Sequence, residues 1–140
     1  ERGKLIHNLL AKINTASDFA SISLPATPDE TEQVKIRQAI QNIISHPLLQ
    51  PCFAPDATIF NEQEIIIPEG TLYRPDRIVV MPEQTFIIDY KTGQPHDSHK
   101  KQISTYASLL EQMGHRNIRL LLAYIDSCEV EEIKYSTDKK

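Results

Sequence analysis

The sequence predicts an α/β protein in which helices flank a central mixed β-sheet. Apolar residues recur at helical spacing in the first third of the chain, which favours two amphipathic helices. Residues 57–91 are rich in Ile, Val, Tyr, Phe and Thr, a composition typical of strands. A further helical pattern and a continuous apolar run follow. The predicted order is helix, helix, three strands, helix and strand.

The two N-terminal helices are predicted from apolar residues three or four positions apart. Residues 14–28 between them are polar and predict a loop with a short helix near residues 18–22. Thr27 is the predicted cap of the second helix, because Pro28 and two acidic residues follow it. The apolar residues are Ile6, Leu9, Leu10 and Ile13 in the first helix and Ile36, Ile40, Ile43 and Ile44 in the second.

The strand-rich region predicts an antiparallel meander. Its three strands are separated by turn-forming residues at 68–70 and 81–84. The remaining predicted elements are a helix capped by Asp97 or Ser98 and stopped by Gly114, a buried strand at residues 118–125 and an edge strand within residues 128–135.

Composition limits the class of protein. The 140 residues correspond to about one domain, and we expect a single domain, residues 1–140, excised from a longer chain. A net charge of -4 argues against a general nucleic-acid coat protein but allows an enzyme that meets nucleic acid in one groove. No apolar run approaches the ~20 residues of a membrane span, so no membrane partner is expected. Two Cys without a CxxC pattern favour a reduced, cytoplasmic protein.

The most informative stretch is a predicted hairpin with carboxylates at its open end. If the two strands pair across a turn at Pro82 and Glu83, Asp76 lies directly opposite Asp89. Opposed side chains share one face, with Cβ atoms about 4.5–5.5 Å apart. Lys91 shares that face because strand side chains alternate. Two carboxylates and an ammonium group are therefore expected together.

Two carboxylates this close favour a bound cation, because like charges raise a pKa unless a cation lies between them. Mg²⁺, held by one or two carboxylates and waters, suits such a site. It would stabilise charge on a phosphate and activate a water, which Lys91 would orient. Spacing leaves one alternative open, ordinary ion pairs of Asp76 with Arg74 or Arg77 and of Asp89 with Lys91.

Four short motifs occur in a fixed order along the chain. They are a Gly-x-x-x-His pattern, an Asp at a strand end, an Asp-Tyr-Lys-Thr sequence and a Gln-x-x-x-Tyr pattern. The matching residues are Gly3 and His7, Asp76, Asp89 to Thr92, and Gln102 and Tyr106. Together they resemble the PD-(D/E)XK nuclease superfamily, and within it the RecB/AddA-type exonuclease domain of UvrD-like helicases. The resemblance spans residues 3 to about 125 and implies a PD-(D/E)XK-like core.

The resemblance implies a metal centre. His7, Asp76, Asp89 and the carbonyl of Tyr90 would bind Mg²⁺, and Asp76, Asp89 and Lys91 would be the catalytic residues, with Lys91 near the attacking water. Mn²⁺ is expected to substitute, because both ions accept oxygen-rich sites. Some relatives hold an iron–sulfur cluster with four Cys, and two Cys in this chain do not supply that pattern.

The resemblance also implies contacts with DNA. Gln102 and Tyr106 would hold DNA beside the site, although Tyr106 also continues the apolar stripe of its helix. Arg74 stands where relatives carry Gly, and it would either contact phosphate or indicate a different approach of the strand. Lys100 and Lys101 form a basic stretch, which either touches the DNA backbone or is a solvated helix start.

The expected function is that of a metal-dependent deoxyribonuclease, an exonuclease in double-strand-break repair and recombination. The expected partners are DNA (single strands or ends), a helicase motor in the same full-length chain and a second helicase–nuclease subunit. One alternative is a catalytically silent DNA-binding or scaffolding module, because fold does not guarantee activity. A restriction or Holliday-junction type of nuclease is disfavoured by His7 and the Gln-x-x-x-Tyr motif.

Overall fold

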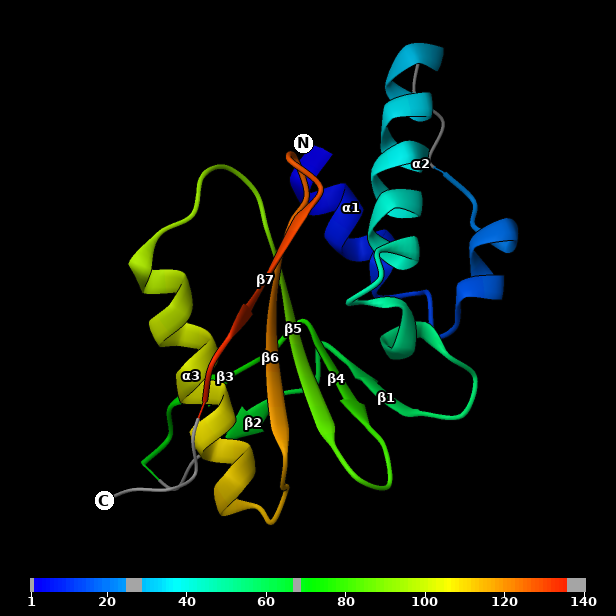
Figure 1. Ribbon diagram of the computed structural model, residues 1–140. Coiled ribbons are helices and arrows are strands. Elements are labelled where there is room, and N and C mark those ends of the chain that lie inside the picture. Colours follow the sequence, from blue (N-terminus) through cyan, green and yellow to red (C-terminus); the bar gives the residue numbers. More distant parts are fainter. Residues whose placement is uncertain (1, 25–28, 67–68, 136–140) are drawn as a thin grey trace.

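The fold is seen in a computed structural model that describes residues 2–24, 29–66 and 69–135. A five-stranded sheet of order β1-β4-β5-β6-β7 lies at its centre, with helices on both faces (Figure 1). This confirms the predicted α/β architecture with a flanked, mixed sheet. The elements are α1 (Arg2–Leu10), η1 (Ala16–Ser21), α2 (Glu30–Ser45), η2 (Gln50–Phe53), β1 (Thr58–Asn61), β2 (Ile65–Ile66), β3 (Leu72–Tyr73), β4 (Arg77–Val80), β5 (Thr85–Lys91), α3 (Asp97–Gln112), β6 (Ile118–Tyr124) and β7 (Glu129–Ile133), where η marks a 3₁₀ helix.

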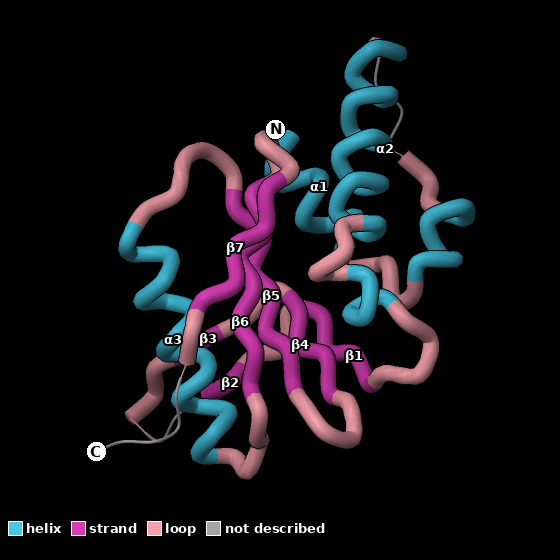
Figure 2. The backbone as a smooth tube through the Cα atoms, in the orientation of Figure 1, coloured by secondary structure: helices cyan, strands magenta, loops and turns pink. Residues whose placement is uncertain are grey.

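Each face of the sheet carries its own hydrophobic core. On one face, α1 and α2 pack against β5, and Ile6 and Ile88 are fully buried there. On the other face, α3 packs against the same strand, and Ile87 and Ile103 are fully buried. The layers are visible as helices on either side of the strands (Figure 2). Because both faces are covered, β5 and β6 are buried along almost their whole length.

The β4–β5 hairpin has the predicted register. Arg77 pairs with Ile88, and Val80 pairs with Thr85. β5 and β6 run parallel, with α3 between them in the chain, whereas β6 and β7 are antiparallel. The carboxyl ends of β5 and β6 therefore lie at the same edge of the sheet. Lys91, the last residue of β5, marks this edge.

The predicted three-strand antiparallel meander is present as β1, β4 and β5, but the connection between its first two strands differs from the prediction. β1 pairs with β4, and β2 and β3 form a separate two-stranded sheet inserted between them in sequence. Glu62 follows β1 with a positive φ of 53°. Pro75, which has no backbone N–H to offer a ladder, precedes β4. Glu62 separates β1 from β2, and Pro75 separates β3 from β4, whereas the sequence pattern predicted one continuous strand in each place.

The cap of α2 differs from the prediction. The helix begins at Glu30, and its N-cap is Asp29, whose side chain accepts a hydrogen bond from the backbone N–H of Thr31. Thr27, the predicted cap, lies outside the described residues, as does Pro28. A carboxylate one position before the helix serves the free amides as well as the threonine hydroxyl would.

The cap of α3 is also corrected. The N-cap residue is His96, rather than Asp97 or Ser98, and its side chain makes no capping hydrogen bond. Both predicted capping residues lie inside the first turn instead. Gly114, with a φ of 102°, follows the end of the helix as predicted, in the left-handed conformation that glycine adopts easily.

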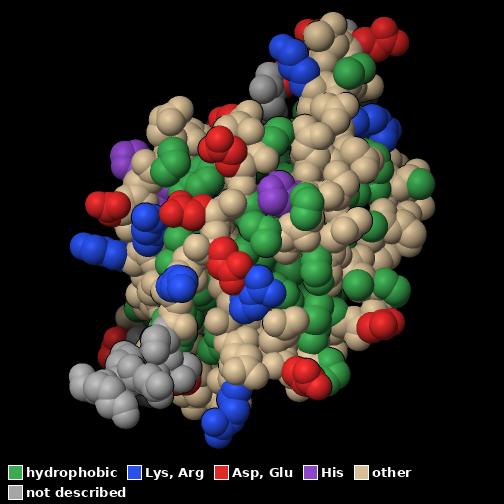
Figure 3. Space-filling view, viewed as in Figure 1, with side chains coloured by type: hydrophobic (Ala, Val, Ile, Leu, Met, Phe, Trp, Pro, Cys, Tyr) green, Lys and Arg blue, Asp and Glu red, His purple; other side chains and the backbone are tan. Residues whose placement is uncertain are grey.

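The surface mixes charges of both signs. On the face in Figure 3, acidic and basic side chains are interspersed, in keeping with the small net charge of -4. Both cysteines are free, Cys52 buried and Cys128 exposed. Within the described ranges, no helix combines the length and the apolar character needed to cross a bilayer.

Candidate active site

Two aspartates meet at the open end of the β4–β5 hairpin, as predicted. The backbone N–H of Asp76 donates to Oδ1 of Asp89 at 3.1 Å. The backbone N–H of Tyr90 donates to Oδ2 of Asp76 at 2.8 Å. Each carboxylate therefore binds the backbone of the opposite strand. These crossed bonds close the hairpin beyond the last pair of β4 and place both carboxylates at the edge of the sheet.

Asp89 and Lys91 lie on the α3 side of β5. Lys91 Nζ is 3.5 Å from Asp89 Oδ2 and donates a 2.6 Å hydrogen bond to Oε1 of Gln102 on α3. Burial raises the pKa of Asp89 to about 6; the charge of Asp76 adds to the rise, and Lys91 opposes it. A buried acid beside a like charge is a place where a cation is stabilising. The Asp89–Lys91 ion pair of the alternative reading is present as part of this larger cluster.

His7 reaches the same edge from α1, which lies on the opposite face of the sheet. Its Nδ1 is 2.9 Å from the Gly3 carbonyl oxygen, and its Nε2 is 2.7 Å from the Tyr90 carbonyl oxygen. Since carbonyl oxygens only accept, both ring nitrogens donate. Nε2 also lies 3.4 Å from Asp76 Oδ2. The hydrogen bond to Asp76 is the main cause that raises the pKa of His7 to about 9, so the metal-free ring is protonated at neutral pH.

Gly3 permits α1 to approach the end of β5. A Cβ atom at this position would lie 2.8 Å from Cγ2 of Thr92, closer than such atoms approach. The Gly-x-x-x-His motif therefore combines two features on one helix. The absence of a side chain at Gly3 leaves room for Thr92, and one turn later the ring of His7 contacts the Tyr90 carbonyl oxygen.

The donor atoms around His7 Nε2 fit a small octahedral cation. Neighbouring ligands of Mg²⁺ stand about 3 Å apart, since each lies about 2.1 Å from the ion at right angles to the next. Nε2 stands 2.7 Å from the Tyr90 oxygen and 3.4 Å from Asp76 Oδ2, which brackets that spacing. Loss of the Nε2 proton would turn the nitrogen into a ligand.

Side chains alone do not complete a metal shell. Across the described ranges, no group of three or more His, Cys, Asp or Glu side chains is placed to hold a metal ion. A cation at His7 and Asp76 would therefore need the Tyr90 carbonyl and water as further ligands. Mg²⁺ tolerates this, because it usually keeps several waters and takes only one or two carboxylates from the protein.

The two tyrosines beside the site belong to the cores. The Tyr90 side chain is buried on the α1 face, as expected for a residue that offers only its carbonyl. Tyr106 is 5% exposed and packs edge-on against Tyr73, with ring centroids 6.1 Å apart. Burial raises the pKa of the Tyr106 hydroxyl to about 12, with smaller contributions from Asp89 and Asp76. Tyr106 thus lies in the core close to the carboxylates, which agrees with its place in the apolar stripe.

The other residues expected to contact DNA have different surroundings. Gln102 is inside the cluster, where it holds Lys91. Lys100 is 3.4 Å from Glu131 of β7, so part of its charge is already matched. Arg74 and Lys101 are exposed. The structure therefore brings Gln102 to the carboxylates and leaves the basic residues on the surface.

Arg77 is not the ion-pair partner that spacing allowed for Asp76. Its side chain is fully buried in the α1 layer, where it donates to carbonyl oxygens of Ile13, Asn14 and Cys52. Alternation along the strand places it on the opposite face from Asp76, a signal that the sequence did contain. Its acceptors come from distant parts of the chain, and no local pattern identifies them.

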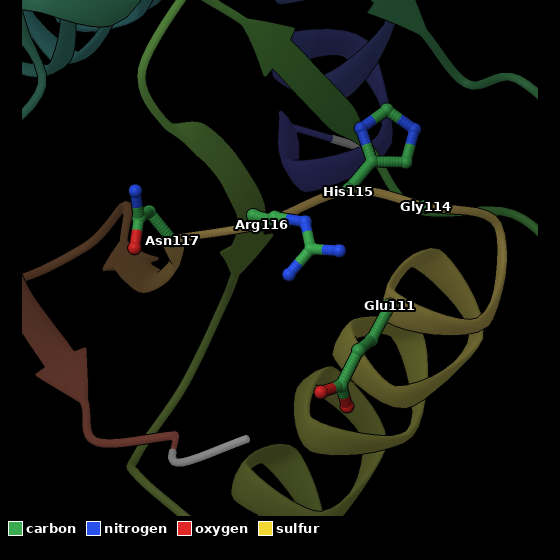
Figure 4. A pocket seen from close by; sticks show the side chains of 5 residues that line it. All are labelled: Glu111, Gly114, His115, Arg116 and Asn117. Atoms are coloured by element: carbon green, nitrogen blue, oxygen red, sulfur yellow. The ribbon is translucent and has the colours of Figure 1, made fainter. Parts of the chain in front are cut away.

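One surface pocket lies away from the carboxylates. Its volume is about 330 Å³, and it occupies the turn between α3 and β6, at the end of the parallel strands opposite the carboxylates. Figure 4 shows the side chains around it, with the carboxylate of Glu111 and the guanidinium of Arg116 on its rim. None of the residues named by the motifs lines it. The candidate site is instead an open edge of the sheet.

Comparison with known proteins adds little. No protein-family model matches the chain, and no curated protein matches it. One of the solved structures that it resembles is described as "Crystal structure of SSO0001", with 23% identity and a TM-score of 0.37, over 76% of this chain and 54% of that chain. The chain thus spans about half the length of that protein. At this level the likeness supports no conclusion about fold family or function.

Proposed function

We propose that this chain is a Mg²⁺-dependent deoxyribonuclease with a PD-(D/E)XK core of the RecB/AddA type, acting on single strands or DNA ends. One observation carries the proposal. His7 Nε2 lies 2.7 Å from the Tyr90 carbonyl oxygen and 3.4 Å from Asp76 Oδ2, beside the Asp89–Lys91 pair. These residues come from separate motifs on a helix and two strands. Their meeting at one edge supports a common chemical task.

The cation would be held by His7, Asp76 and the Tyr90 carbonyl, and the family resemblance adds Asp89 as a further ligand. When bound, Mg²⁺ stabilises negative charge on a phosphate and lowers the pKa of a bound water. Mn²⁺ is expected to replace it. The burial of Asp89 strengthens its interaction with any cation nearby, because the local dielectric is lower than in water.

Lys91 supplies the positive charge that faces the substrate. Its ammonium group has three N–H donors. Gln102 accepts one, and Asp89 lies 3.5 Å from the same nitrogen, which leaves a donor for a phosphate oxygen or for the attacking water. In hydrolysis the water oxygen bonds to phosphorus while one P–O ester bond breaks, and the leaving oxygen takes a proton. Lys91, oriented by Gln102, is placed to stabilise the charge that builds up on phosphate oxygens.

Cleavage of end-labelled linear DNA tests the proposal. Single- and double-stranded substrates are incubated with Mg²⁺, Mn²⁺ or EDTA, and we expect products only with a metal. Asp89→Asn should abolish cleavage, whereas Asp56→Asn, at an exposed aspartate before β1, should not. Lys91→Ala and Lys12→Ala form a second matched pair, since Lys12 is exposed and follows the end of α1. DNA binding without metal-dependent cleavage would reject the nuclease in favour of a silent binding module.

The proposed biological setting rests on the same resemblance. We propose that the domain works in the cytoplasm in double-strand-break repair, where a helicase motor in the same full-length chain delivers DNA to it. A second helicase–nuclease subunit is the other proposed partner. Co-purification of the full-length chain with such a subunit, and faster digestion when ATP drives the motor, would be the expected results.

A further inference from the structure

We propose that Arg77 is a positioning residue that fixes α1, and with it His7, against the strands that carry Asp76 and Tyr90. The proposal rests on the metal-dependent function above and concerns how its site is assembled. Asp89, Lys91 and Gln102 all lie on the α3 side of the sheet, whereas His7 comes from the α1 side. The site is therefore complete only if α1 keeps a fixed position relative to the strand ends at this edge of the sheet.

The Arg77 side chain uses all of its hydrogen-bonding capacity. A guanidinium has five N–H donors. Nη1 donates to the Ile13 carbonyl at 2.6 Å and to Asn61 Oδ1 at 3.1 Å. Nη2 donates to the carbonyls of Asn14 at 2.8 Å and Cys52 at 3.0 Å, and Nε donates to Cys52 at 3.2 Å. Five donors therefore meet acceptors on three separate segments.

These acceptors join the end of α1 to the sheet. Ile13 and Asn14 follow α1, Cys52 belongs to η2, and Asn61 is the last residue of β1. Arg77 itself begins β4, directly after Asp76. The rigid, planar guanidinium of Arg77 thus connects the segment that follows α1, the helix of His7, to the strand that begins directly after Asp76.

The hydrogen bonds of Arg77 are directional, as is the bond of His7 itself to the Tyr90 carbonyl, whereas the apolar contacts of α1 are not. Ile6, Leu9 and Leu10 hold α1 by apolar burial, which is non-directional and permits small sliding movements. The guanidinium is held in its plane by these hydrogen bonds and on one face by Phe53, whose ring centre lies 3.9 Å from the guanidinium carbon. Mg²⁺ demands near-ideal octahedral geometry, so a small displacement of His7 would weaken its binding.

None of the five hydrogen bonds of Arg77 ends on a carboxylate, so charge pairing does not explain the residue. A lysine would keep the charge but offers three donors in place of five and lacks the planar fork. Arg77→Lys therefore removes most of these hydrogen bonds while it keeps the positive charge of the side chain. Arg119→Lys is a matched control, because Arg119 makes a two-pronged pair with Glu132 on the outer part of the sheet and lies over Phe86 at 5.0 Å.

The test is a double-mutant cycle in Mn²⁺ affinity, measured by calorimetry on folded protein. We expect Arg77→Lys to weaken binding at least about tenfold, as loss of a supporting residue around a metal typically does. In a His7→Ala background the same change should have no further effect, because Arg77 acts through His7. Arg119→Lys should leave the affinity unchanged. Wild-type affinity in Arg77→Lys, or effects that multiply in the double mutant, would overturn the proposal.

A metal-free measurement separates this proposal from the nuclease function. The His7 ring signals in NMR spectra recorded with EDTA should shift in Arg77→Lys and stay in place in Arg119→Lys. If Arg77→Lys does not fold, Asn61→Ala removes one of the five bonds and should move the same signals, with a loss of Mn²⁺ affinity of about threefold. Unchanged His7 signals would refute the positioning role. If wild type binds no Mn²⁺, the nuclease proposal fails and these signals still decide the role of Arg77.

Discussion

Removal of the His7 imidazole should change how the stability of the metal-free protein depends on pH. The pKa of His7 is raised from 6.5 to about 9 in the folded protein. A raised pKa means that folding stabilises the protonated form. The resulting stability is fully present below pH 6.5 and is lost as the pH rises through about 9.

The size of the effect follows from this pKa difference. At 1.36 kcal/mol for each pH unit, the difference between 6.5 and about 9 sets a ceiling of about 3 kcal/mol. Because 26% of the His7 side chain is exposed, solvent screens part of the interaction, and we expect a loss of about 1–2 kcal/mol. Asp89, with a pKa of about 6, is about half ionised at pH 6 and mostly ionised above pH 7, and it is present in wild type and variant alike.

Urea unfolding followed by circular dichroism measures the effect. The free energy of unfolding is determined in EDTA between pH 6 and pH 9 for wild type and for His7→Gln. The wild-type value should fall across this range, and the variant should lose much less. His115→Gln, at the far end of the sheet, should follow wild type. Equal losses in wild type and His7→Gln would refute the reasoning, since the slope would then come from other groups.

Three further changes have expected outcomes. Gln102→Ala frees Lys91 from its 2.6 Å hydrogen bond and should lower the kcat for DNA cleavage about tenfold with little change in Mn²⁺ affinity by calorimetry. Gly3→Ala should lower the melting temperature, because its Cβ meets Thr92 Cγ2 at 2.8 Å; in a Thr92→Ser background, which lacks Cγ2, the same change should be neutral or stabilising. Arg119→Ala removes an exposed pair with β7 and should cost no more than about 1 kcal/mol in urea unfolding.

The arrangement of the carboxylates could be predicted because a hairpin is a local structure. A turn at Pro82 and Glu83 fixes the register, and strand alternation then decides which side chains share a face. The meeting of Asp76, Asp89 and Lys91 follows from these two rules alone. The apolar run of residues 118–125 also identifies β6, because both faces of that strand are covered.

Features that depend on contacts between distant residues could not be predicted in the same way. The partners of Arg77 lie on segments 16 to 64 residues away, and no periodicity connects them. The β2–β3 insertion is bounded by single residues, Glu62 and Pro75, whose conformations depend on tertiary structure. The α3 cap was misplaced for another reason: Asp97 and Ser98 both suit a cap, but the chain enters the helix one residue earlier.

The carboxylates of Asp76 and Asp89 also stabilise the hairpin, because each accepts a hydrogen bond from the backbone of the facing strand end. Asp89 accepts this bond through Oδ1 and Asp76 through Oδ2, the oxygen that also lies nearest His7 Nε2. Removal of either side chain therefore also breaks a hydrogen bond that joins the two strands at the end of the hairpin. The backbone amide left without an acceptor should lower the free energy of unfolding by about 1–3 kcal/mol. Selection for a stable fold alone would retain these aspartates through long periods without catalysis. Asparagine, which keeps one oxygen acceptor, is the substitution that separates the two contributions, whereas alanine removes both together.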